Sequence, residues 1–294
     1  MRSAPVAALI ILARLPVPLP AQISNIVVTN AASFQVGVPA PGSIGTIFCT
    51  GLSVTGVVSA PGTPLPTTLA GATVTVGGVP AFLFAVADLG GYQQINFQVP
   101  YGIQYGSATS GAVLVNIVVT QSASRGTVTA TPADEIGAFF RSGSTQYGIF
   151  QHGADYSLVT TESPAKAGET IIGYATGIEP PSPSVPAGQA TPDSPLYWVP
   201  QTSEFLTVDL HTLYIAGGGV TFGAATGAGL LFMGLAPGMV GVYQVNFVMP
   251  NVESGVATVT LGQTTCVPNV IDACQNPNSI VFAKGQSTVL IPVQ

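Results

Sequence analysis

The chain has 294 residues, enough for one large domain or two of ordinary size. Hydrophobic residues make up 47% and charged residues only 6%, far below the roughly 25% of an ordinary soluble domain, which argues against a disordered chain. The formal net charge is −6, and residues 134–294 alone carry −8, which argues against nucleic acid or an anionic membrane surface as a partner.

The N-terminal segment has the features of an export signal. Arg2 precedes a mostly apolar stretch, residues 4–19, which ends in Leu-Pro-Ala before Gln22. This order predicts a signal peptide over residues 1–21 and a secreted or cell-surface protein. Arg14 interrupts the stretch, so a misassigned start or a hydrophobic strand is the alternative interpretation. No later apolar run approaches the ~20 residues that span a bilayer, so we expect no transmembrane segment in the mature chain.

The next part of the chain alternates short apolar runs with turn residues. We expect strands at residues 23–28, 44–50, 74–76, 82–86, 94–99, 113–120 and 127–131. The Gly77-Gly78 pair predicts a hairpin in which residues 82–86 return beside residues 74–76. Only Asp88 and Arg125 are charged between residues 22 and 133, so this surface is either solvated by uncharged polar groups or covered by other subunits.

One strand is spelled twice, as QINFQVP at residues 94–100 and QVNFVMP at residues 244–250. Apolar and polar residues alternate in each copy, and the final proline ends the strand because it has no backbone donor. Asparagine is unfavourable in strands, so we interpret Asn96 and Asn246 as structural residues that bond the backbone of a neighbouring loop, with a ligand contact as the alternative. The motif residues are Gln94, Asn96, Phe97, Pro100, Gln244, Asn246, Phe247 and Pro250.

The second half repeats the order of the first. PGSIGTIFCTGLS (41–53) matches AGETIIGYATGIE (167–179), and the proline-rich loop at 61–66 returns enlarged at 179–188. Many strands without an amphipathic helix predict antiparallel sandwiches. We therefore expect an all-β fold of two tandem immunoglobulin-like β-sandwich domains, residues 22–133 and 134–294. The second copy's final strand ends the chain, so we expect no C-terminal anchor.

Three cysteines are present. Cys266 and Cys274 are close in sequence and predict a local disulfide that closes the loop 266–274, in keeping with an oxidising compartment. A metal site would need further ligands nearby. Cys49 follows Ile-Phe and is expected to be a buried apolar residue.

The sequence motifs resemble one protein family. The order C-T-G-L, V-x-V-G-G-V-x-A, Q-I-N-F-Q-V-P and Y-Q-V-N-F-x-M-P, with NAASF and PAPGS at residues 30–43, is similar to the uncharacterised C-terminal domain of acidobacterial (Solibacter-type) secreted proteins. The resemblance runs from about Asn30 to Gly262. It implies an extracellular protein and no established activity. Each half also resembles, more weakly, the immunoglobulin-like IPT/TIG domains.

No catalytic constellation is evident. His152 has Asp155 and Ser157 close by, which leaves a hydrolase of the Ser-His-Asp type as a less favoured alternative to a solvated turn. His211 lies in an expected strand and is interpreted as structural. Asp134 and Glu135 suggest a charged linker rather than a calcium site. We expect no enzyme, no metal and no cofactor.

These features favour an exported, non-enzymatic structural or interaction protein that self-associates or binds other extracellular proteins. Strand pairing between copies is the expected route, through residues 23–28 or 287–293; the residues concerned are Ile23, Val27, Val289 and Ile291. The alternative is a carbohydrate-binding or adhesive module, in which Tyr197, Trp198 and Tyr214 would stack on sugars.

Overall fold

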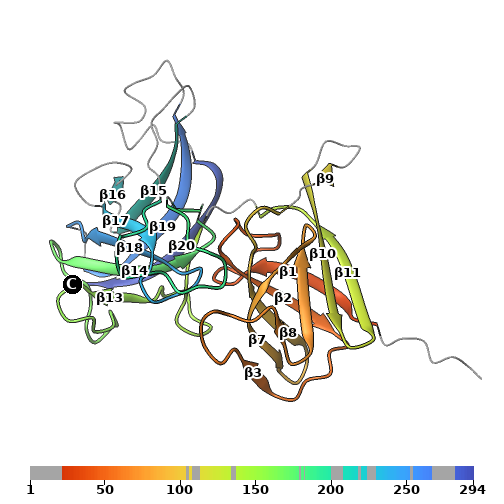
Figure 1. Cartoon of the computed structure of the whole chain (residues 1–294). Coiled ribbons are helices and arrows are strands. Elements are labelled where there is room, and N and C mark those ends of the chain that lie inside the picture. Colours follow the sequence, from red (N-terminus) through yellow and green to blue (C-terminus); the bar gives the residue numbers. More distant parts are fainter. Residues whose placement is uncertain are drawn as a thin grey trace, which may run out of the picture.

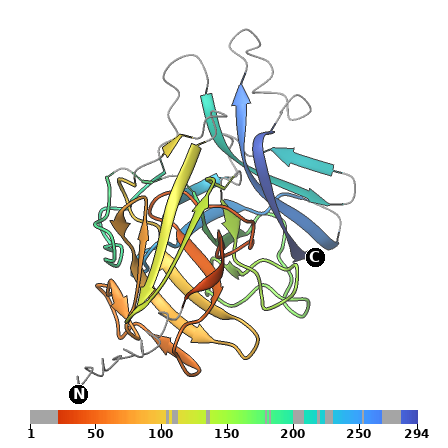
Figure 2. The same ribbon diagram turned by 90° about the vertical axis from the view of Figure 1, so that its right-hand side faces the viewer.

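The computed structural model describes residues 22–103, 106–107, 113–133, 137–178, 180–181, 183–199, 208–217, 220–223, 230–251, 254–266 and 282–294. Within these ranges the chain has no helix, and its strands form four antiparallel sheets. The sheets make two sandwiches that lie side by side, each with its own hydrophobic core (Figures 1 and 2). The predicted fold is confirmed: all-β, with two tandem immunoglobulin-like sandwiches.

The first sandwich contains eleven strands in two sheets. One sheet has the order β1-β2-β8-β7-β3; the other has the order β11-β10-β5-β4, with β6 paired to β5 and β9 to β10. The bounds are Ser24–Asn30 (β1), Ile44–Thr50 (β2), Val57–Ser59 (β3), Thr68–Leu69 (β4), Ala72–Val76 (β5), Val79–Pro80 (β6), Phe82–Asp88 (β7), Gln93–Gln98 (β8), Gly106–Ser107 (β9), Val113–Gln121 (β10) and Ser124–Ala130 (β11).

The second sandwich repeats this plan. One sheet has the order β12-β14-β18-β17, with β13 paired to β14, and the other has the order β16-β15-β19-β20. The bounds are Ala138–Phe139 (β12), Phe150–His152 (β13), Thr170–Thr176 (β14), Val208–Gly217 (β15), Val220–Gly223 (β16), Leu230–Leu235 (β17), Tyr243–Val248 (β18), Gly255–Cys266 (β19) and Phe282–Val293 (β20).

The hairpin predicted at Gly77-Gly78 is wrong in its second arm. The turn returns as the two-residue strand β6, which pairs with β5. Ala81 N still donates to Val74 O at 2.9 Å, and Phe82 then begins β7 in the opposite sheet, beside β8. The chain therefore crosses between the two sheets where the sequence suggested a simple return.

The repeated strand occupies the same place in both sandwiches. β8 lies between β2 and β7, and β18 lies between β14 and β17. The backbone N–H of Gly42 donates to Val99 O at 2.8 Å, and that of Gly168 donates to Met249 O at the same distance. The alternate apolar residues of each copy are buried in the cores: Ile95, Phe97, Val99, Val245, Phe247 and Met249.

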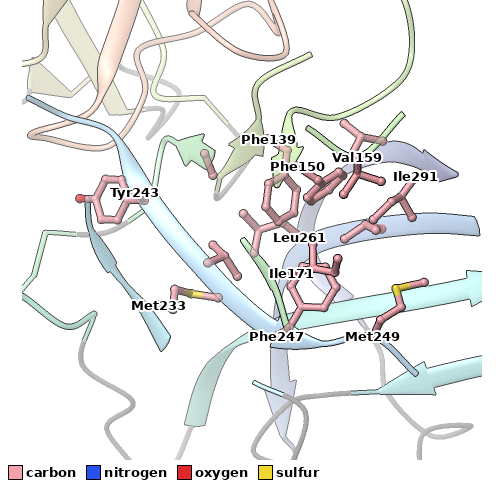
Figure 3. Close-up of a cluster of buried hydrophobic side chains, with 14 of the residues drawn as sticks. Phe139, Phe150, Val159, Ile171, Met233, Tyr243, Phe247, Met249, Leu261 and Ile291 are labelled. Carbon is pink, nitrogen blue, oxygen red and sulfur yellow. The ribbon is translucent and has the colours of Figure 1, made fainter. Parts of the chain in front are cut away.

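The two cores place glycine at different positions of matching strands. In β2, a Cβ on Gly45 would come within 2.7 Å of the Phe97 ring. In β14, Gly173 leaves the room instead: a Cβ there would come within 2.7 Å of Phe139 and 2.8 Å of Phe150. These two rings lie 5.2 Å apart between their centroids and pack in the second core (Figure 3). Each glycine thus makes room for aromatic rings.

The edges of several sheets are covered by short segments of the same chain. Gly37 N donates to Val28 O, which adds the segment 35–37 to the free side of β1. On the free side of β20, Gly148 N donates to Leu290 O at 3.0 Å. These backbone groups are therefore already paired within the chain.

Candidate functional site

Three aromatic rings form a row on the outer face of the sheet β1-β2-β8. Phe48 lies at the centre, 6.1 Å from Phe34 and 5.4 Å from Tyr92 between ring centroids. Phe34 is 56% exposed and Tyr92 49% exposed, and Val27 on β1 pairs with Phe48 in the strand register. We call Phe34, Phe48, Tyr92, Val27 and the exposed Val36 the aromatic surface.

The turn after β1 holds Phe34 in an unusual backbone conformation. Its φ of 62° lies in the left-handed region, which a bulky side chain rarely adopts. Asn30 fixes the turn: its side-chain oxygen accepts from Ala32 N at 2.8 Å, and its carbonyl accepts from Phe34 N at 3.0 Å. The ring is thus held outward by the backbone of the turn.

The polar residues of the repeated strand bond each other on the same outer face. Gln94 Nε2 donates to Asn96 Oδ1 at 2.5 Å, and Gln244 Nε2 donates to Asn246 Oδ1 at 2.9 Å. In the first copy, the Thr46 hydroxyl also donates to Asn96, at 3.4 Å. The asparagine oxygens therefore accept from side chains of the same sheet, and the bond from the amide to a loop backbone stays a prediction.

The two sandwiches are joined by buried hydrogen bonds. Thr176, at the end of β14, accepts from Ile44 N at 2.8 Å, and its hydroxyl donates to Gly241 O at 2.8 Å. Ser43 Oγ donates to Ile178 O at 3.3 Å. Because Thr176 and Ser43 are fully buried, these bonds are shielded from water.

The repeated strand contributes a second part of this junction through Gln98, the last residue of β8. Its amide oxygen accepts from Gly188 N at 2.6 Å, and its amide nitrogen donates to Gly42 O at 3.0 Å. Gly188 O in turn accepts from Leu65 N at 2.8 Å. The two proline-rich loops, which the sequence aligned as equivalents, therefore meet at the junction.

His152, at the end of β13, has partners that the sequence did not suggest. Its Nδ1 lies 3.0 Å from Glu169 Oε2, while its Nε2 lies 3.2 Å from Ser163 Oγ and 3.1 Å from the Ser163 carbonyl oxygen. The side chain of His152 is only 11% exposed. The arrangement has the order of an acid–histidine–serine triad, and it also fits a histidine that ties a loop to β13.

The amides around Ser163 decide between these readings. Ser163 N donates to Thr160 O, and Ala165 N donates to Pro292 O. Glu162 N and Lys166 N are bonded to Thr160 Oγ1 and Glu169 Oε1 respectively. Acyl transfer needs free donors for a developing oxyanion, and these four neighbouring amides are engaged. The geometry therefore favours the second interpretation, in which His152 holds the loop around Ser163 against β13.

Asp155 and Ser157 form a separate turn. The Ser157 hydroxyl donates to Asp155 Oδ1 at 2.7 Å and its N–H at 2.9 Å, and these two bonds lower the pKa of the exposed carboxyl. The structure therefore gives His152 different bonded partners from the two that the sequence suggested.

Other residues singled out by the sequence are placed as follows. Cys49 is buried in the first core, as predicted, and burial raises the pKa of its thiol to about 11. Cys266 ends β19, and Cys274 lies outside the described residues, so the disulfide stays a prediction. Asp134 and Glu135 also lie outside the described residues. His211 and Tyr214 belong to β15.

Trp198 belongs to the predicted sugar-stacking group and is exposed. It is 47% exposed and packs edge-on against Phe232, with 4.7 Å between ring centroids. Tyr197 is partly buried against the second core. Its carbonyl accepts from Leu235 N at 2.9 Å, so the segment 197–199 covers the edge of β17.

The strands expected to pair between copies have occupied edges at several positions. Leu290 N donates to Gln146 O at 2.9 Å, and Ala165 N donates to Pro292 O at 2.9 Å. The side chains of Ile23, Val289 and Ile291 are buried, whereas Val27 is 41% exposed. Exchange of either strand would first have to break internal bonds.

The aromatic surface was missed by sequence reasoning, although one signal was present. In β2 the buried residues Gly45, Ile47 and Cys49 alternate, which places Phe48 on the outer row. An aromatic residue on the outer row of an otherwise amphipathic strand marks a possible contact surface. The positions of Phe34 and Tyr92 beside it depend on turns that the pattern does not reveal.

Among the described residues, no group of three or more His, Cys, Asp or Glu side chains is placed to hold a metal ion. No helix in this part of the chain is long and apolar enough to cross a membrane.

No protein-family model and no curated protein matches the sequence. Among solved structures, a titin structure is similar at 12% identity and a TM-score of 0.18, covering 92% of this chain and 97% of that one. The C-terminal domain of the AgI/II polypeptide BspA of Streptococcus agalactiae is similar at 8% identity and a TM-score of 0.18, covering 91% and 99%. At such scores these likenesses carry no argument, and the fold assignment rests on the strand order above.

Proposed function

We propose that this is an exported, non-enzymatic structural protein that acts by associating with other copies of itself outside the cell. The observation that carries the proposal is the uneven distribution of charge between the two sandwiches, both of which expose large apolar side chains. The second half, residues 134–294, holds eleven acidic and three basic side chains, a net charge of −8. The first half, residues 22–133, holds one of each.

The uncharged half also exposes large apolar side chains. Those of the first sandwich are Val27, Phe34, Val36, Val57, Leu89, Tyr92 and Val113. Apolar surface with little charge around it favours association, because neither repulsion nor desolvation of charge opposes contact. The acidic second sandwich would keep the assembly soluble.

The junction between the sandwiches supports a structural role. Its bonds through Gln98, Thr176 and Ser43 are buried and join both sheets that carry the repeated strand. A junction of this kind holds the two sandwiches as one stiff unit, which suits a subunit that must present its surfaces at a fixed angle.

Sedimentation velocity of the mature protein over a wide concentration range tests the proposal. We expect the weight-average sedimentation coefficient to rise with concentration, and electron microscopy to show oligomers or polymers. A protein that remains monomeric at every concentration would refute self-association.

A glycan-binding or adhesive function is the second candidate, and the exposed Trp198 ring favours it. It predicts binding on a glycan array that is lost in Trp198→Ala. An array without binding would remove this candidate and leave the first untouched.

A further inference from the structure

We infer that the aromatic surface of the first sandwich is where a second copy of the chain docks, in a two-fold contact between like faces. The inference rests on the proposed self-association and assigns it a place and a symmetry. The surface is the row of Phe34, Phe48 and Tyr92 with Val27 and Val36 beside it.

The row is continuous and built on rigid elements. Phe48 belongs to the central part of the sheet, where β2 pairs with both β1 and β8. Phe34 and Tyr92 lie on either side of it at ring distances typical of interacting aromatics. Exposed aromatic side chains held on a fixed scaffold are the usual anchors of protein interfaces, because little conformational freedom is lost when they are covered.

The turn at Phe34 fixes the direction of the ring. The φ of 62° is left-handed, and the Asn30 side-chain oxygen accepts from Ala32 N, which maintains the turn. The ring remains 56% exposed, so it offers apolar surface that a partner can cover.

The absence of charge on the aromatic surface is compatible with a like copy as the partner. A two-fold contact brings identical groups near each other across the interface, and like charges there would repel. The aromatic surface contains no charged residue, and the nearest one in sequence, Asp88, accepts from Gly90 N in its own turn. A contact between two such faces therefore has no charged pair to separate.

The polar neighbours favour a protein over a sugar. Sugar recognition needs amide groups free to bond hydroxyls. Asn96 Oδ1 already accepts from both Gln94 and Thr46. This oxygen is therefore not free to accept from a sugar hydroxyl.

The test compares the mature wild type with the double variant Phe34→Ser/Tyr92→Ser by sedimentation velocity. We expect the variant to associate at least ~10-fold more weakly, since interface aromatics dominate binding. Tyr156→Ser is the matched control, because Tyr156 is an aromatic residue of the second sandwich with a φ of 61° and 65% exposure. It should associate like the wild type.

Phe34→Gly provides a variant whose fold is secure, because glycine accepts the left-handed backbone while the ring is lost. It should also weaken association, with an unchanged or higher melting temperature. Association that persists in both variants would overturn the docking surface and leave self-association standing. A monomeric wild type would overturn both proposals. Loss of glycan binding in the double variant, with sedimentation unchanged, would identify a sugar as the occupant instead and overturn this inference.

Discussion

The two copies of the repeated strand, residues 94–100 and 244–250, share their inward side and differ on the side that meets a neighbour. Both bury the phenylalanine and both form the glutamine–asparagine bond. The fifth residue of the motif differs. In the first copy it is Gln98, which bonds the second sandwich, and in the second copy it is Val248. Both copies have apolar residues at the positions that fill a core, whereas only the first copy, which lies at the junction, uses a side-chain amide at the fifth position.

The residue before the neighbouring strand, β2 in the first copy and β14 in the second, differs in the same way. Ser43 donates across the junction to Ile178 O, while its counterpart Glu169 binds His152 within the second sandwich. The same position thus bonds the other sandwich in the first copy, through Ser43, and holds a loop within its own sandwich in the second copy, through Glu169. Duplicated folds diverge where their surroundings differ, and the following variants test that division.

Removing the shared core ring should have the largest effect. Phe97→Ala and Phe247→Ala each delete a fully buried ring, and each should lower the free energy of unfolding by about 3–5 kcal/mol. Urea unfolding measures the change. Val57→Ala, at a side chain 61% exposed, is the control and should change little. Equal small losses in all three would mean that the repeated strand is not a core element.

The glycines that make room for rings should come next. Gly45→Ala and Gly173→Ala place a methyl group within 3 Å of an aromatic ring, which should cost about 1–3 kcal/mol by overpacking. Thermal unfolding measures it. Gly91→Ala is the matched control, because a Cβ there meets no atom within 4 Å. A neutral Gly45→Ala would show that the Phe97 ring moves freely.

Replacing Gln98 with the residue of the second copy should loosen the junction. Gln98→Val leaves Gly188 N and Gly42 O without their partner, at a cost of about 1–2 kcal/mol. Small-angle scattering should show a wider spread of interdomain angles. Val248→Gln, the reverse change in the second copy, should leave the scattering unchanged. An unaltered profile for Gln98→Val would show that the Thr176 bonds suffice.

The smallest effect concerns Cys49, which has Ala175 as its counterpart. Burial raises the pKa of the thiol from 9.0 to about 11, so the folded state disfavours the thiolate. Its contribution to stability is full below pH 9 and is lost as pH rises toward 11, because the unfolded chain ionises first. In Cys49→Ala, this loss of folding stability between pH 9 and pH 11 should be absent. Iodoacetamide should label native Cys49 slowly; rapid native labelling would contradict its burial.

Sequence reasoning found most of the strands because alternation reports which side of a strand is buried. It predicted correctly which side of β8 and β18 is buried, from the alternation of Ile95, Phe97 and Val245 with polar residues. It failed where the chain leaves one sheet for the other, between Ala81 and Phe82, because a glycine pair predicts a turn and not the length of the strand that follows.

The candidate site was less accessible to such reasoning. Phe34 and Tyr92 reach Phe48 through turns, and Gln98 meets Gly188 across 90 residues of sequence. Proximity of this kind depends on how the sheets stack. The same holds for His152. Its neighbours in sequence, Asp155 and Ser157, bond each other, whereas its bonded partner Glu169 is the residue just before β14.

The segments that cover the sheet edges have a mechanical consequence. In each sandwich two separate early segments form isolated parallel bridges with the last strand or the residues just after it: Gln22 and Val38 bridge to Arg125 and Pro132, and Tyr147 and Ala165 bridge to Leu290 and Val293. Tension applied to the two ends of a sandwich would pull these parallel segments past each other along their length. Several hydrogen bonds would then bear the load together instead of opening one at a time, so the rate of forced unfolding should be low.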